Sequence, residues 1–321
     1  KLSNKLFSNS SVSYSNFSFL TGQKYKEKSI DTLRKYQFKY RSGVEHLSVR
    51  MDFDFLPTPE HYIRFGIDGT LQQFKPGVTV GTNRSSVPVD LDTSSNRNSV
   101  TGRQLSFYME DDWEITTNLN ANIGVNFNTY YVRQKWYKHI EPRISARYTI
   151  NEKSSVKAAW GLVNQNLHLL THSTIGLPTD LWVPATQDIT PAHGNQYSLG
   201  AVYLFGKGIN ISLDLYYKEM NGLIEYKEGA SYVDDYGWEK KVTAGNGKSY
   251  GAELFVEKQQ GKTTGWLSYT LSWSNRKFEN LNFGEVFPFK FDRRHVFNIT
   301  MNHQFRNNMS LSATWVYNTG R

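Results

Sequence analysis

The stretch from Phe287 to Gly320 decides the fold, and it reads FPFKFDRRHVFNITMNHQFRNNMSLSATWVYNTG. Apolar and polar side chains alternate over residues 296–305, and after a tight turn at 306–308 they alternate again over 309–318. Such alternation is typical of a β-strand with one apolar and one polar face. Each strand has about ten residues, whereas the mean strand has about five or six and a membrane-crossing strand about nine to eleven. The stretch therefore predicts one hairpin of a membrane barrel.

The same alternation recurs through the rest of the chain. The second face of these stretches carries Arg, Asp, Ser, Thr and Asn, which a dry core does not tolerate but a water-filled or plugged lumen does. Short turns alternate with mostly longer connections, as in outer-membrane barrels whose short turns are periplasmic. We therefore predict an all-β fold, an antiparallel transmembrane β-barrel of the outer-membrane type. About thirteen strands are expected, at 7–20, 47–55, 63–70, 105–114, 119–128, 143–150, 156–162, 197–205, 209–218, 250–256, 267–274, 296–305 and 309–318.

The connections between these strands differ in length. The turns at 57–60, 116–118, 151–154, 206–208 and 259–263 are short, whereas the expected loops are long and polar. The longest irregular stretch is predicted at 164–195, where three prolines occur. The other expected loops and links lie at 21–34, 75–100, 136–142 and 219–248.

Composition narrows the class of protein. The mean hydropathy is -0.57 and the chain has no apolar run of eighteen residues, which excludes a transmembrane helix. The aromatic content of 15% suits the interfacial girdles of a barrel, although an aromatic-rich soluble β protein would also fit the composition. Cysteine is absent, so thiolate metal sites and disulfides are excluded. The net charge of +8 is scattered rather than clustered, and we predict no nucleic-acid partner.

Four segments carry a resemblance to a known family. They are SFYMEDDWEI at 106–115, EPRISARYTI at 141–150, ITPAHGNQYSLGAVY at 189–203 and FPFKFDRRHVFNIT at 287–300. In this order they resemble the barrel of TonB-dependent outer-membrane receptors, and the similarity covers nearly all 321 residues. Phe291 stands where the family typically has a tyrosine before Asp-Arg-Arg-His.

The resemblance implies a function and a setting. Members of the family begin with a globular plug, continue through twenty-two strands and import scarce nutrients across the outer membrane of Gram-negative bacteria. We therefore expect residues 1–321 to be a single partial barrel domain, with the plug and the C-terminal strands outside this sequence. The implied cargo is a siderophore, corrinoid, glycan or peptide, and no cofactor is expected. The implied partners are outer-membrane lipid, the TonB complex acting through the plug, and a small nutrient ligand, with a surface lipoprotein as a further candidate.

Candidate site residues are few, and none suggests an enzyme. His168, His172 and His193 lie in or beside the longest loop, but their spacing matches no compact metal motif. They and Trp182 are candidate ligand contacts, the tryptophan by stacking, and solvated surface histidines are the alternative interpretation for the three histidines. A charge network that steadies the start of a strand is predicted for Asp292 with Arg293 and Arg294.

Two alternatives remain open at this stage. A passive porin would share the architecture but lack a plug, and a soluble β-rich binding protein would purify without detergent.

Overall fold

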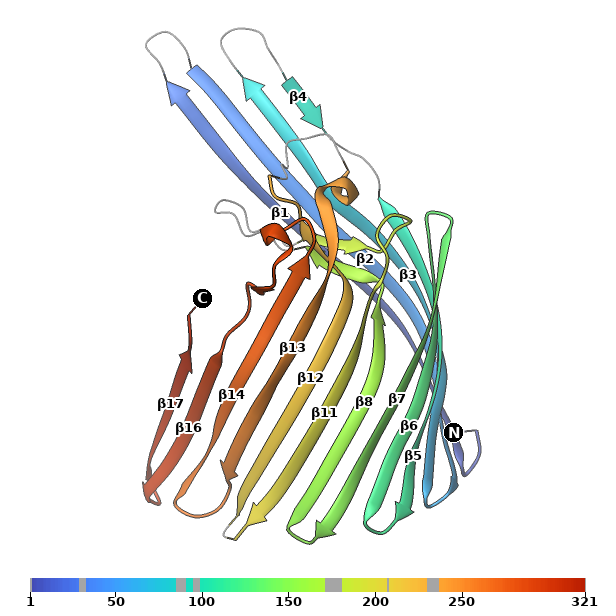
Figure 1. Ribbon diagram of the computed structural model, residues 1–321, viewed down its shortest axis with the longest axis vertical. Coiled ribbons are helices and arrows are strands. Elements are labelled where there is room, and N and C mark those ends of the chain that lie inside the picture. The colour runs from blue at the N-terminus through green and yellow to red at the C-terminus, as the bar shows by residue number, and fades with distance from the viewer. Residues whose placement is uncertain are drawn as a thin grey trace.

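The computed structural model describes residues 2–28, 33–84, 91–94, 99–170, 181–206, 208–229 and 237–320. Thirteen strands follow one another in a single antiparallel sheet, each paired with the next (Figure 1). These strands are β1 (Leu6–Lys28), β2 (Leu33–Thr58), β3 (His61–Arg84), β5 (Val100–Thr116), β6 (Leu119–Val132), β7 (Lys135–Asn151), β8 (Ser154–Gln165), β11 (Ala192–Phe205), β12 (Ile209–Tyr226), β13 (Val242–Lys258), β14 (Thr263–Phe278), β16 (His295–Arg306) and β17 (Met309–Asn318). Each contains one of the thirteen predicted stretches, so the predicted all-β antiparallel architecture is confirmed.

Six smaller elements complete the fold. Strands β4 (Leu91–Ser94) and β15 (Phe287–Pro288) pair at the side of the large sheet, and β9 (Leu167–Leu170) and β10 (Leu181–Pro184) form a separate two-stranded sheet. Two short 3-10 turns, η1 (Trp238–Lys241) and η2 (Asn282–Gly284), lie in the long connections. Among the described residues, no helix has the length and apolar character needed to cross a membrane.

The strands are longer than predicted at the end that carries the long connections. The first three have 23, 26 and 24 residues and rise beyond the rest of the sheet (Figure 1). Strand pairing therefore continues into the expected loops 21–34, 75–100 and 219–248, and β7 includes the expected link 136–142. Backbone pairing does not require an apolar face, so strands that meet water on both sides lose the alternation by which they are predicted.

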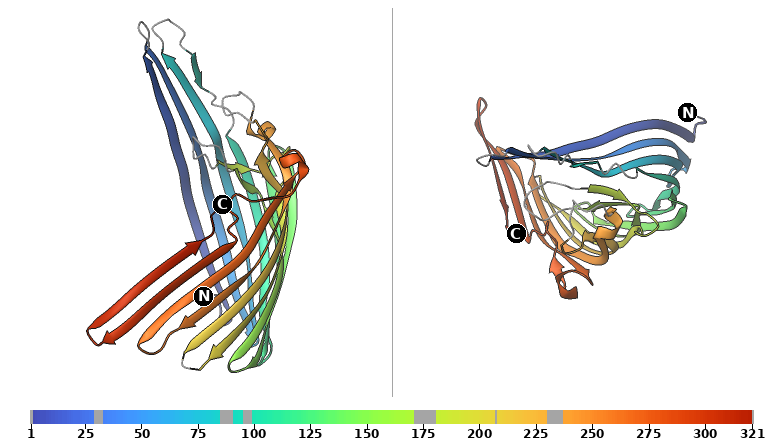
Figure 2. Two further views of the ribbon diagram at one scale, coloured as in Figure 1. Left: turned by 60° about the vertical axis from the view of Figure 1, so that its left-hand side comes forward. Right: turned by 90° about the horizontal axis from the view of Figure 1, so that it is seen from above.

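The large sheet curls into a trough (Figure 2). Within the described residues its margins, β1 and β17, do not pair with each other. On the convex face large apolar side chains are exposed, for example Phe107 (46%), Val125 (44%) and Trp315 (57%). Contiguous apolar exposure of this kind is what a lipid-facing surface requires. The polar alternate positions turn to the concave face, as predicted.

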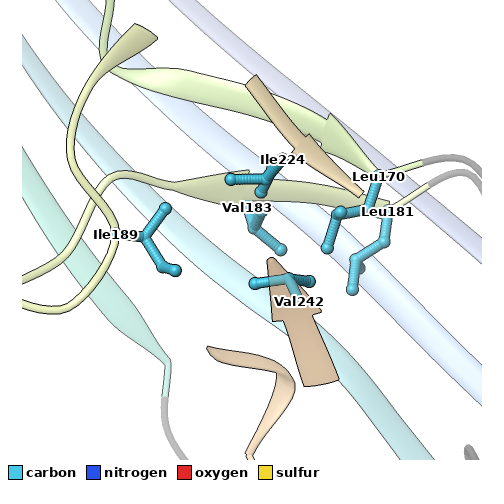
Figure 3. Close-up of a cluster of buried hydrophobic side chains, with 6 residues drawn as sticks. All are labelled: Leu170, Leu181, Val183, Ile189, Ile224 and Val242. Atoms are coloured by element: carbon cyan, nitrogen blue, oxygen red, sulfur yellow. The ribbon is translucent and has the colours of Figure 1, made fainter. Parts of the chain in front are cut away.

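The small β9–β10 sheet lies inside the trough near the end with the long connections (Figure 2). One side of it packs in an apolar cluster with the ends of β12 and β13, and Figure 3 shows the six side chains, which are Leu170, Leu181, Val183, Ile189, Ile224 and Val242. A second cluster fixes the following residue, Ala185, to the opposite wall through Phe74, Val100, Tyr130 and Val132. The described parts of the expected irregular stretch, 164–170 and 181–195, thus contact both sides of the trough.

Gly102 of β5 provides a test of the second cluster. A Cβ atom there would lie 2.7 Å from Cε2 and 2.8 Å from Cζ of Tyr130, which is fully buried. We expect Gly102→Ala to lower the free energy of unfolding by about 1–2 kcal/mol, because the ring must move in a packed site. Gly69→Ala is the matched control, since its nearest neighbours would be 4.0 Å away. Equal denaturation midpoints for the two variants would refute the packing described for Tyr130.

Candidate binding surface on the concave face

The concave face carries a belt of ion pairs that crosses the wall from β2 to β12. Arg50 Nε lies 2.8 Å from Asp52 Oδ1, Arg64 Nη2 lies 2.8 Å from Glu110 Oε1, and Lys157 Nζ lies 2.8 Å from Asp214 Oδ1. We call this the ion-pair belt, and its members are Arg50, Asp52, Arg64, Glu110, Asp112, Arg143, Lys157 and Asp214. Charges with partners on a polar wall are expected where water or a polar ligand fills the interior.

Glu110 is the centre of the belt. Its carboxylate is 9% exposed and binds Arg64 through one oxygen and Arg143 through the other. Arg64 also reaches Asp112 Oδ2 at 3.3 Å, and Asn122 Nδ2 donates to Asp112 Oδ1 at 2.6 Å. Strands β3, β5, β6 and β7 are thereby joined through side chains as well as through their backbones.

A second set of polar residues lies between the belt and the small sheet, and three of them, Ser106, Asn128 and Tyr130, are buried. The strand register forms two rows of three residues across β5, β6 and β7. One row is Ser106, Asn128 and His139, and the next is Gln104, Tyr130 and Tyr137. We call these six residues the neutral patch, because none carries a fixed charge. From the base of β9, Asn166 Nδ2 donates to Gln104 Oε1 at 3.2 Å and contacts Asn128 Oδ1 at 3.5 Å.

His168 of β9 is buried rather than presented to solvent. It is 5% exposed, and its Nε2 donates to the carbonyl oxygen of Thr190 at 3.1 Å, since a carbonyl can only accept. Burial lowers the pKa of His168 from 6.5 to about 4, partly opposed by this hydrogen bond. The imidazole therefore holds the small sheet in place as a neutral donor.

This histidine makes the packing of the small sheet pH-dependent. When the sheet is displaced, His168 regains its ordinary pKa of 6.5, whereas in place it has a pKa of about 4. Between these two pKa values the displaced form binds more protons than the packed form. The contribution of His168 to the packing of the small sheet is therefore complete above pH 6.5 and is lost as the pH falls toward 4. We expect amide-exchange protection of residues 167–170 and 181–184 to fall over this window. In His168→Gln, whose side chain is a donor that does not titrate, amide-exchange protection should not change with pH. If protection in the wild type is equally independent of pH, His168 does not hold the small sheet in place.

The other loop candidates do not converge on one site. Trp182 pairs with Leu169 and neighbours Val183, the partner of His168, so Trp182 and His168 lie on opposite faces of the small sheet. His193 is exposed on β11, where alternation with exposed Tyr197 and Leu199 places it on the convex side. His172 lies outside the described residues. Ligand contact through these four residues remains a prediction.

Asp292, Arg293 and Arg294 lie just before β16. Asp292 accepts from the backbone N–H of Ser274 at 2.6 Å and pairs with Arg294 Nη2 at 3.4 Å. Arg293 contributes its carbonyl oxygen, which accepts from Ser272 Oγ at 3.0 Å, while the Arg294 guanidinium lies 4.7 Å from the Trp273 ring centroid. The geometry brings Asp292 and Arg294 together beside β14, as the predicted network requires, whereas the Arg293 contact is made by its backbone.

The sequence analysis does not predict the ion-pair belt or the neutral patch. Their signal is present in the segments 106–115 and 141–150, where the polar alternate residues include Glu110, Glu141 and Arg143. Sequence alone does not give the strand register that sets these residues side by side. Within the described residues, no group of three or more His, Asp or Glu side chains could hold a metal ion.

One family of known proteins matches this chain. Residues 2–321 match the family described as TonB dependent receptor-like, beta-barrel, whose members are transport receptors rather than enzymes. A search of curated proteins found no match.

Solved structures of similar fold include the following three. The ferric-catecholate import receptor Fiu of E. coli K12 shares 11% identity with a TM-score of 0.59, covering 97% of this chain and 54% of its own. The FrpB iron transporter of Neisseria meningitidis shares 11% identity with a TM-score of 0.59, and the match covers 93% of this chain and 50% of that protein. The pyoverdine-bound FpvA of P. aeruginosa shares 13% identity with a TM-score of 0.68, and the match covers 99% of this chain and 44% of that protein. At these identities the likeness shows the fold alone, and this chain spans about half the length of these structures.

Proposed function

Because the chain belongs to the TonB-dependent receptor β-barrel family, we propose that it forms part of the wall and the outer connections of an energised nutrient importer. The protein lies in the outer membrane of a Gram-negative bacterium, with its convex face in lipid. The observation that carries the proposal is the family match over residues 2–321, together with a concave face lined by ion pairs and amides. A polar wall of this kind lets a hydrated cargo pass.

The import mechanism assigns a task to each part of the protein. Cargo binds from outside to the long connections and the upper concave face, where the small sheet and the neutral patch lie. Energy comes from the TonB complex, which pulls on a plug domain that belongs to the same protein but not to this sequence. The cargo is a siderophore, corrinoid, glycan or peptide, and a surface lipoprotein is a further candidate partner. The chain has no enzymatic role in this scheme.

Deleting the gene and, separately, the gene for TonB tests the proposal. Nutrient-limited cultures are supplied with ferric siderophores, corrinoids, oligosaccharides or peptides, and cell-associated label is followed over time. We expect one class of cargo to accumulate only when both genes are intact. Accumulation that needs this protein but not TonB would support the second candidate, a passive channel, for which the solvated concave face is the favourable observation. Unchanged accumulation of every class in both deletions would refute import.

A further inference from the structure

Two layers of chain lie across the end of the trough that carries the long connections (Figure 2). The lower layer is the small sheet with the segment that follows it. This layer packs on β12 and β13 at one wall through Val183 and on Phe74 of β3 at the other through Ala185. The upper layer is η1, in the connection between β12 and β13. We call the two layers together the outer cap, and its residues are 167–170, 181–189 and 237–241.

Trp238 holds η1 on the small sheet. Its ring packs against the apolar cluster of Figure 3, but its Nε1 atom is buried and has no hydrogen-bond partner among the described residues. A buried donor without a partner costs free energy, so this contact holds η1 less firmly than a fully satisfied one would. The other end of η1 is tied to β12, because the backbone N–H of Lys227 donates to the carbonyl oxygen of Lys241 at 2.8 Å. The position of the upper layer therefore depends on what else binds the first turn of η1.

One ion pair ties this first turn to a hairpin elsewhere in the wall. Arg133 Nη1 lies 2.6 Å from Glu239 Oε1, and the two side chains are 37% and 15% exposed. Arg133 belongs to the turn between β6 and β7, whereas Glu239 follows β12, so β8 and β11 lie between them in the sheet order. The other ion pairs among the described residues cross at most one intervening strand. The Arg133–Glu239 pair therefore spans part of the outer cap instead of joining neighbours in the wall.

The turn that carries Arg133 has a strained backbone. Arg133 and Gln134 have φ angles of 42° and 67°, in the left-handed region where two-residue turns favour asparagine and glycine. Backbone strain of this kind clusters at clamps and switch regions, where the surrounding structure maintains it. The contact that the strained turn makes here is the one between Arg133 and Glu239.

Glu239 is the more buried partner of the pair. Without Arg133, its shielded carboxylate would lose its cation, which favours an arrangement in which η1 moves away from the small sheet and into water. Trp238 alone would then oppose the movement. The ion pair is thus the contact whose loss changes the position of the upper layer most.

Resting on the import function proposed above, we propose that the outer cap is a lid over the concave face and that Arg133 and Glu239 form its latch. While the ion pair is made, η1 lies on the small sheet and covers the path from outside to the concave face. When the pair breaks, η1 leaves the small sheet and the path opens. The latch regulates access to the surface where cargo is proposed to bind, before any step that needs TonB.

Labelling of a cysteine beneath the outer cap tests the latch. Gln196 is a suitable position, because it is exposed on β11 and alternates with Tyr197 and Leu199 of the convex face, which places it on the concave face. Residues 1–321 contain no cysteine, so Gln196→Cys is a single probe once any cysteine elsewhere in the full-length protein is replaced by serine. Whole cells that lack TonB are treated with a polyethylene-glycol maleimide too large to cross the outer membrane.

The charge reversals Arg133→Glu and Glu239→Arg should each open the lid. We expect the probe to react at least about fivefold faster in either variant, because attraction between the two side chains becomes repulsion. The double variant Arg133→Glu/Glu239→Arg should return to the slow rate, because the pair forms again with its charges exchanged. Arg133→Gln, which only removes the cation, gives the same comparison with a smaller increase if a charge reversal does not fold.

Two controls accompany these variants. Lys248→Glu reverses a cation whose partner, Glu219 at 3.4 Å, lies on the neighbouring strand, and it should leave the reaction of the probe unchanged. Phe283→Cys places a probe in η2, where the side chain is fully exposed and the chain projects from the convex side (Figure 2), so it should react equally in every variant. Gel migration with and without heating verifies that each variant is folded.

The outcomes separate the latch from import itself. Equal reaction rates at Gln196→Cys with the latch intact and in both single reversals, or a double variant as fast as the single ones, would overturn the latch. Energised import would survive that result, because the assay contains no TonB. Loss of TonB dependence for every cargo would instead remove the proposed function while leaving the measured labelling rates in place.

Discussion

Val125→Arg is expected to destabilise the protein in a lipid bilayer by about 2–4 kcal/mol. Val125 is 44% exposed on the convex face of β6, between Met109 of β5 and Pro142 of β7. A guanidinium at this position must leave water and enter hydrocarbon. The change is measured as the shift in reversible urea unfolding of the full-length protein in liposomes.

The neighbouring position supplies the control. Asn126→Arg adds the same side chain one residue further along β6, where the strand alternation turns it to the concave face beside Glu141, whose carboxylate now accepts from Asn126. We expect a change below about 1 kcal/mol there, because the new cation gains a partner near water. Equal destabilisation by the two variants would mean that the convex face does not meet lipid.

The second large effect is expected at Glu110. Glu110→Gln keeps the shape of the side chain but removes the charge that Arg64 and Arg143 share. Arg64 keeps Asp112 at 3.3 Å, whereas Arg143 forms no other ion pair with a described residue. Removing one partner of a buried pair costs about 3–5 kcal/mol, and the half-exposed arginines reduce this to about 2–3 kcal/mol in the free energy of unfolding.

Asp214→Asn is the matched control for Glu110→Gln. It is the same acid-to-amide change on the same face, but Asp214 and Lys157 have side chains that are 32% and 54% exposed. Exposed pairs contribute about 0–1 kcal/mol, so its unfolding midpoint should barely move. If the two variants lose equal stability, Glu110 does not organise the belt.

Much of the fold could be predicted because alternation is a local signal. Over 119–128 and 309–318 every second residue is apolar, and these stretches form β6 and β17. The signal does not reach the ends of the first strands, so residues 21–28 of β1 and 75–84 of β3 lie in stretches expected as loops. Register is also absent from the local pattern. The pairing of Asn128 with His139 depends on the two-residue turn at Arg133 and Gln134, where both backbones adopt positive φ.

The candidate site was harder to predict for the same reason. His168, His172, Trp182 and His193 share a loop in the sequence, but burial of His168 and its separation from Trp182 follow from the β9–β10 pairing and its packing against Ile224 and Val242. Glu110 and Arg143 are 33 residues apart and meet only because two hairpins stand side by side. Asp292 and Arg294 are neighbours in sequence, and their proximity could be inferred without the fold.

Accessibility of spin labels along β6 tests most directly the claim on which the import proposal rests, that the convex face meets lipid and the concave face meets water. The sequence contains no cysteine, so single cysteines can be introduced at 122, 123, 125, 126 and 127; Gly124 is left out because a Cβ atom there would lie 2.9 Å from Arg143 Nε. In liposomes, labels at 123, 125 and 127 should collide mainly with dissolved oxygen, and labels at 122 and 126 mainly with a water-soluble nickel chelate. A two-residue alternation with these phases is the predicted result. Uniform nickel accessibility at every position would contradict the account.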